Sequence, residues 1–69
     1  MKKLRALRKA RKLSLRDLER ESGVHYSTIS RIENGEYLPN LATLLKLSRA
    51  LKVSLEDLID EEELIGLVK

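Results

Sequence analysis

Few side chains in this 69-residue sequence are of the types that catalyse reactions. His25 is the single histidine, and there is no cysteine. A nucleophilic triad would need a serine and an acid converging on His25. Ser22, Ser27 and Asp17 are close to His25 in sequence. Helix geometry, however, gives them no shared pocket and no oxyanion site. We therefore predict no catalytic residue and no enzyme, and we expect His25 either to donate to a phosphate as a neutral side chain or to cap a helix.

Metal binding is also predicted to be absent. One histidine without cysteine does not supply the set of ligands that holds a structural zinc ion. The acidic run at Asp57, Asp60 and Glu61–Glu63 lacks the glycine-centred spacing of a calcium loop, so we interpret it as a solvated helix end. We predict no cofactor, and no small-molecule substrate is evident.

Charge is distributed unevenly along the chain, whose net charge is +3. Residues 1–23 hold nine Lys/Arg and three Asp/Glu, whereas residues 54–69 hold one Lys and six Asp/Glu. One end can therefore face a polyanion and the other cannot. No apolar run approaches the roughly 20 residues of a membrane span, and no signal-peptide core follows the basic N-terminus. Together with the missing cysteines, this predicts a cytoplasmic protein that does not bind membranes.

The secondary structure is predicted to be helical, because no segment alternates apolar and polar residues with a period of two. Apolar residues recur every three or four positions in five segments, about 2–12, 14–22, 25–34, 41–51 and 54–59. The first has Leu4, Leu7 and Ala10 or Arg11 on its apolar stripe. The fourth is the richest in leucine and is the predicted centre of the core. We predict one all-α domain of five helices over residues 1–60, followed by an acidic and apolar tail over residues 61–69.

Several residues are typical of helix ends. Ser14 with Asp17, and Ser54 with Asp57, have the spacing of a capping box. Gly23 suits a left-handed C-cap, Asn34-Gly35 ends the third helix, and Asn40 caps the fourth. A loop is expected over residues 36–39. In the third helix Ile29 and Ile32 face the same way, and the polar side chains fall on the other sides.

Residues 15–35 combine a helix, a turn that contains glycine and a second helix, which is a helix-turn-helix. Residues 4–59 resemble the phage-repressor and Cro family, also called XRE-type. The markers are Leu-x-x-Leu-Arg at 4–8, Gly23-Val24, the stretch STISRIENG at 27–35, Pro39, and Val53-Ser54-Leu55. The resemblance implies a compact lambda-repressor-like domain whose third helix lies in the DNA major groove. It also implies a homodimeric transcriptional regulator, a repressor, that binds double-stranded DNA with its recognition helices about 34 Å apart.

The resemblance implies a role for individual residues on the third helix. Tyr26, Ser27 and Arg31 face the bases, and arginine suits a bidentate contact with guanine O6 and N7. Thr28 and His25 lie near a phosphate strand.

Other candidate contacts lie outside that face. Positive charge to compensate for missing contacts is available at Lys2, Lys3, Arg5, Arg16 and Arg20, and Arg16, near the start of the second helix, is the best phosphate candidate among them. The backbone of Asn34 could meet a phosphate, although a plain C-cap explains that residue equally well. Arg8 is expected to form a salt bridge with Glu33, which would tie the first helix to the end of the third.

Three residues depart from the family pattern. Leu15 replaces a polar residue that reaches the DNA, Glu19 replaces a small residue between the two helices, and Glu36 replaces a basic residue that meets a phosphate. These departures favour a second hypothesis, a helical protein–protein interaction module, antitoxin-like or co-activator-like, with weak or no DNA binding. A third hypothesis is an idealised bundle without activity.

The apolar tail also leaves two alternatives open. In the first alternative, a dimerisation patch is formed by Leu45 and the segment 64–68. In the other, the tail folds back on its own core.

Overall fold

The computed structural model describes residues 1–36 and 38–68, without the side chains of residues 67 and 68. The predicted loop residue Tyr37 and the side chains of Leu67 and Val68 therefore lie outside the described residues. The described part is all helical, which confirms the predicted class. Its elements are α1 (Lys2–Ala10), α2 (Leu15–Ser22), α3 (Tyr26–Glu33), α4 (Leu41–Leu51), α5 (Leu55–Leu58) and α6 (Glu61–Val68). Residues 61–68, predicted only as a tail, thus form a sixth helix.

Local capping chemistry sets the helix ends where the sequence predicts them. The Ser14 and Ser54 side chains accept hydrogen bonds from the backbone N–H groups of Asp17 and Asp57, and both capping boxes are complete. Gly23 ends α2 with φ +79°, in the left-handed region, where a glycine has no Cβ to clash. Asn40 caps α4 by accepting from the Thr43 N–H at 2.9 Å.

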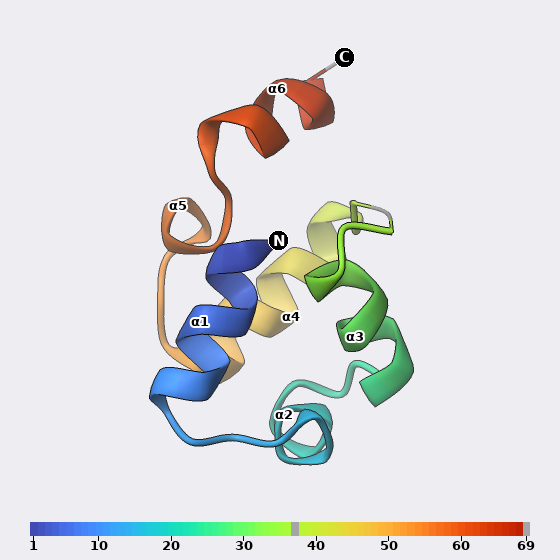
Figure 1. The fold of residues 1–69 in the computed structure, drawn as a ribbon, viewed down its shortest axis with the longest axis vertical. Helices are drawn as coiled ribbons and strands as arrows, with labels where there is room; N and C mark the ends of the chain where they lie inside the picture. The colour runs from blue at the N-terminus through green and yellow to red at the C-terminus, as the bar shows by residue number, and fades with distance from the viewer. Residues whose placement is uncertain (37, 69) are drawn as a thin grey trace.

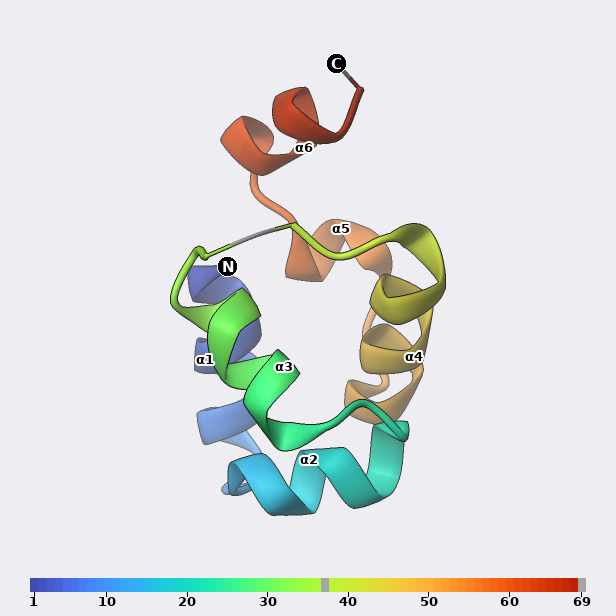
Figure 2. The same ribbon diagram turned by 90° about the vertical axis from the view of Figure 1, so that its right-hand side faces the viewer.

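Five helices enclose one apolar core. α2 packs on α3 and α4, α1 packs on α3 and α5, and α4 packs on α5. Figures 1 and 2 show α2 at one end of the long axis, with α1, α3 and α4 above it. The fully buried large side chains come from each of these five helices: Leu4, Leu18, Ile29, Ile32, Leu47 and Leu58.

The inner face of α1 differs from the predicted apolar stripe. Leu4 is fully buried and Leu7 half-buried, but Ala10 and Arg11 are exposed. The face is completed by Arg8, which is only 9% exposed. An arginine can replace an apolar residue there because a buried carboxylate satisfies it, as described below.

α6 lies at the opposite end of the long axis from α2 (Figures 1 and 2). It begins with another reciprocal pair: the Asp60 N–H donates to Glu63 Oε1 at 3.2 Å, and the Glu63 N–H donates to Asp60 Oδ1 at 3.0 Å. Leu64 and Ile65 of this helix are each about half exposed, at 51% and 54%. Among the described residues, no helix is both long enough and apolar enough to span a bilayer.

Candidate nucleic-acid interface

The two isoleucines of α3 fix which side of that helix meets solvent. Ile29 and Ile32 are fully buried in the core. Arg31 is exposed, and Tyr26, Ser27 and Thr28 are half-buried. Ser27 and Arg31 are four residues apart and therefore neighbours on the helix surface. The structure thus gives α3 a polar outer face made of the residues expected to contact DNA.

The start of α3 is held by His25. Its ring Nδ1 accepts a hydrogen bond from the Ser27 N–H at 3.2 Å and lies 2.7 Å from Ser27 Oγ. An acceptor at this position satisfies one of the free N–H groups at the start of the helix. His25 is therefore a helix cap, one of the roles expected of it. Its ring is exposed, with 59% of the side chain accessible.

A cluster of side chains joins α2 to the start of α3. The guanidinium carbon of Arg16 lies 3.9 Å from the centre of the Tyr26 ring, a distance typical of a cation–π contact. Glu19 lies near both helices: its carboxylate is 4.0 Å from Arg16 Nη1 and 3.9 Å from His25 Nε2. The Arg16 side chain still has 67% of its surface exposed, so it can also contact another molecule.

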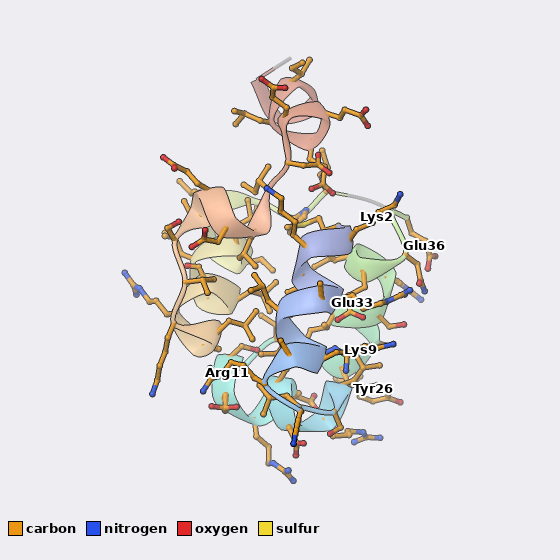
Figure 3. All side chains as sticks on the ribbon, turned by 60° about the vertical axis from the view of Figure 1, so that its left-hand side comes forward. Lys2, Lys9, Arg11, Tyr26, Glu33 and Glu36 are labelled. Atoms are coloured by element: carbon orange, nitrogen blue, oxygen red, sulfur yellow. The ribbon has the colours of Figure 1, made fainter. Side chains whose placement is uncertain are left out.

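The other end of α3 is tied to α1 through Glu33 (Figure 3). Arg8 Nε donates to Glu33 Oε2 at 2.6 Å, and Arg8 Nη2 donates to Glu33 Oε1 at 3.0 Å. Only 2% of the Glu33 side chain is exposed, and 11% of Arg8. The hydrogen bond that Arg8 donates to the Glu33 carboxylate raises the pKa of Arg8 by more than burial lowers it. The salt bridge that the family resemblance implies is therefore present, buried and bidentate.

Arg5 is a second partner of this end of the helix. Its Nε donates to Glu33 Oε1 at 3.3 Å, and its Nη2 donates to the side-chain oxygen of Asn34. From the sequence, Arg5 is predicted only to add positive charge. Its spacing of three from Arg8 on one helix was the available signal, because it places both arginines on the same face.

Asn34 acts as a C-cap of α3, and the phosphate contact suggested for its backbone stays a prediction. The Asn34 N–H donates to the Ser30 carbonyl at 3.0 Å, and the Gly35 N–H donates to the Ile32 carbonyl at 3.1 Å. Both donors are already used within the end of the helix. The plain C-cap, the alternative kept open above, describes the local geometry.

The three departures from the family pattern have different structural consequences. Leu15 is half-buried and packs against the core, so it takes no part in the polar surface. Glu19 lies beside Arg16 and His25 instead of being buried between α2 and α3. Glu36 is exposed beyond the end of α3 (Figure 3), and its negative charge would face any phosphate that approached there.

The chemistry available on this surface is hydrogen bonding, stacking and charge. In the described part of the chain, no three His, Cys, Asp or Glu side chains are grouped so that they could hold a metal ion. Arg31 is exposed and has no carboxylate within salt-bridge distance among the described residues. Arg20, in contrast, pairs with Asp17 one turn earlier on α2.

Comparison with known proteins agrees with this geometry. A profile of the family described as "Helix-turn-helix" matches residues 4–58. The HTH-type transcriptional repressor RghR of Bacillus subtilis is 51% identical over 57 residues, which are 81% of this chain and 42% of that protein. A second regulator of the same organism, RghRB, is 49% identical over 57 residues, 81% of this chain and 41% of that protein. The chain thus spans less than half the length of these relatives.

A solved structure has the same fold. The restriction-modification controller protein C.AhdI from Aeromonas hydrophila superimposes with a TM-score of 0.80 and 34% sequence identity. The match covers 84% of this chain and 88% of that one.

Proposed function

We propose that this chain, which belongs to the helix-turn-helix family, is a sequence-specific transcriptional regulator that reads the major groove of double-stranded DNA with α3. The observation that carries the proposal is the division of α3 into two faces. Ile29 and Ile32 anchor the helix in the core, and Arg31 projects into solvent. The major groove of B-DNA admits one α-helix, and helix-turn-helix proteins insert the second helix of the motif there.

Each polar residue of the surface has a proposed contact. Arg31 forms two hydrogen bonds with guanine O6 and N7, Ser27 donates to or accepts from a base edge, and the Tyr26 ring meets a thymine methyl group. Thr28, His25 and Arg16 lie toward the phosphate strand. At the far end of α3, the backbone of Asn34 is the proposed phosphate contact, and the Arg5 guanidinium holds the Asn34 side chain.

We further propose that two copies bind together, because a single motif of this size contacts only half of a two-fold operator. The apolar face of α4, α5 and α6 supports this. Leu41 is 61% exposed, and it borders a groove of about 340 Å³ that is also lined by Leu44, Leu55, Ile59 and Leu64. The half-exposed Leu64 and Ile65 extend the same apolar surface along α6. Leu45, the other residue predicted for this patch, is itself half-buried.

The homodimer is tested by sedimentation over a range of protein concentrations. Leu64→Asp together with Ile65→Asp should shift the equilibrium toward the monomer and weaken operator binding. Lys46→Asp, an exposed change on α4, is the control for added negative charge. If the double variant and the control sediment alike, the dimer does not use this face.

The proposed effect on transcription is repression, as in the name of RghR. A regulator must share a compartment with the DNA it binds, so the proposal includes a cytoplasmic location. The competing hypothesis is the protein–protein interaction module, which the exposed Glu36 and the acidic α6 favour.

One experiment distinguishes these hypotheses. Oligonucleotides bound by the protein are selected from a random pool, and the affinity for the selected site is then measured against salt. For a DNA-binding regulator we expect a two-fold symmetric site. The logarithm of its affinity should fall with the logarithm of salt by about 0.9 per neutralised phosphate. If no sequence is enriched and mixed DNA is not retained at low salt, the interaction module is the better description.

A further inference from the structure

Four side chains where α2 meets α3 form a closed ring of contacts. Arg16 lies 3.9 Å from the centre of the Tyr26 ring, and the Tyr26 ring centre is 4.6 Å from that of His25. His25 Nε2 is 3.9 Å from Glu19 Oε2, and Glu19 Oε1 is 4.0 Å from Arg16 Nη1. Each residue therefore has two neighbours in the ring. Two of the residues, Arg16 and Glu19, come from α2, and the other two are the N-cap and the first residue of α3.

This ring restricts the direction of the Tyr26 side chain. A tyrosine at the first position of a helix has few backbone neighbours that limit its rotation. Here a guanidinium covers one face of its ring, and the attraction between cation and ring favours that rotamer. The Glu19 carboxylate keeps Arg16 over the ring, which gives this departure from the family pattern a physical role. The tilted His25 ring, fixed by its cap contact with Ser27, is the other neighbour of Tyr26.

We propose that Arg16 is a positioning residue for Tyr26, and that the two act together as one specificity determinant for DNA. The inference rests on the proposed function and deepens it. Arg16 holds the Tyr26 ring at one angle, so that the outer edge of the ring meets one base step in the major groove. The exposed N–H groups of Arg16 can still donate to a neighbouring phosphate. Arg16 then affects which base is chosen, and not only the overall affinity.

This assignment differs measurably from a plain phosphate contact. Loss of a phosphate contact weakens binding to all sequences by a similar factor. Loss of a residue that positions Tyr26 lowers discrimination at the base position that Tyr26 reads. A cation–π contact at an exposed site corresponds to about a two- to fivefold effect, so we expect the preference at that position to fall by about two- to fivefold.

The test uses the selected site and its single-base variants. Affinities are measured for the wild type, Arg16→Ala, Tyr26→Leu and the double variant. Arg20→Ala is the matched control, because it removes an exposed arginine from the next turn of α2 that pairs with Asp17 and not with Tyr26. Thermal unfolding of every variant establishes that it is folded before binding is compared.

The expected result is a shared loss at one position. Arg16→Ala and Tyr26→Leu should lower the preference at the same base, and the double variant should lower it no further than Tyr26→Leu alone. Arg20→Ala should weaken all sites equally. A measurement without DNA adds a second criterion: the proton resonances of the Arg16 side chain should show the ring-current shift of Tyr26, and this shift should vanish in Tyr26→Leu.

Three results would overturn the inference in different ways. If Arg16→Ala weakens all sites by one factor, as Arg20→Ala does, Arg16 is a phosphate contact and Tyr26 orients itself without it. If the wild type selects no sequence, the proposed function fails and this inference fails with it. Absence of the ring-current shift in the wild type would refute the stacked geometry whatever the outcome of selection.

Discussion

Arg8 of α1 and Glu33 at the end of α3 are joined by two hydrogen bonds in a buried fork, at 2.6 and 3.0 Å. Arg8 also donates to the Leu13 carbonyl at 2.8 Å, so the same guanidinium fixes the chain between α1 and α2. No described buried side-chain N or O atom lacks a hydrogen-bond partner. This pair therefore sets the position of the recognition helix relative to α1 without leaving a polar group unsatisfied.

Glu33→Ala should lower both stability and DNA affinity. The substitution leaves the buried guanidinium of Arg8 without its carboxylate, which costs about 3 kcal/mol in the free energy of unfolding when a buried pair is broken. DNA affinity should fall because the end of α3 loses its attachment to α1. Urea unfolding and operator binding are the measurements. The control is Glu36→Ala, which removes an exposed acid nearby, and equal stability of the two variants would contradict the prediction.

The stability of the domain should fall in acid through its two capping boxes. The Ser14 and Ser54 N–H groups donate to Asp17 and Asp57 at 2.9 and 3.0 Å. These backbone hydrogen bonds are the main reason why the pKa of each carboxyl is lowered in the folded state. Between the folded and unfolded pKa values the unfolded chain binds more protons, so stability rises with pH there.

The contribution of the capping boxes should therefore be complete above about pH 4, the ordinary pKa of an aspartate. It should be lost as the pH falls through the lower folded-state values. Urea unfolding at several pH values measures this slope. Asp17→Asn with Asp57→Asn should flatten it, because neither asparagine titrates. A slope that is unchanged in the double variant would show that other carboxylates dominate the acid sensitivity.

Gly23→Ala should destabilise the domain through the backbone alone. An added Cβ would meet no atom within 4 Å, but φ at this position is +79°. An alanine held in the left-handed region costs about 1 kcal/mol. Gly23→Asn should cost less, since asparagine tolerates that region. Thermal unfolding of the pair tests the prediction, which fails if the alanine variant is as stable as the wild type.

Lys52→Gly should have the opposite effect. Lys52 ends α4 with φ +58°, a conformation that glycine adopts without the Cβ penalty. We expect the free energy of unfolding to rise by roughly 1 kcal/mol. Lys46→Gly removes the same side chain from the interior of α4 and should lower stability by about the same amount. Chemical denaturation of both variants provides the comparison.

Arg31→Ala should relax the choice of base at one position of the operator. If Arg31 forms the bidentate guanine contact proposed above, its removal should reduce discrimination there by about 1–3 kcal/mol. Preferences at the other positions should stay as in the wild type. Affinities for a set of single-base variants measure this directly. A uniform loss across the set would mean that Arg31 contacts only the phosphate backbone.

The sequence predicted most of the fold because helix ends depend on neighbours in the chain. Ser14 with Asp17, Gly23, and Asn40 each act within one helical turn, so their effect can be read from spacing alone. The start of α6 follows the same rule, because Asp60 and Glu63 have capping-box spacing and form the reciprocal hydrogen bonds. The acidic composition of residues 60–63 hides this signal, since it also fits a solvated helix end. The sequence also predicts the buried side of α3, since Ile29 and Ile32 are three residues apart.

By itself, then, the sequence determined the helices and caps up to residue 59 and the division of α3 into a buried and an exposed face. The Arg8–Glu33 pair is implied by the family resemblance, and only the tertiary structure decided which other charged side chains meet. Arg5 and Arg8 converge on Glu33, and Arg16 lies over Tyr26 beside Glu19, because packing brings α1 to the end of α3 and α2 to its start. Spacing along the chain cannot select these partners, since the sequence contains 14 Lys/Arg and 11 Asp/Glu. The distances that the packed core imposes determine which of these charged side chains lie close enough to pair.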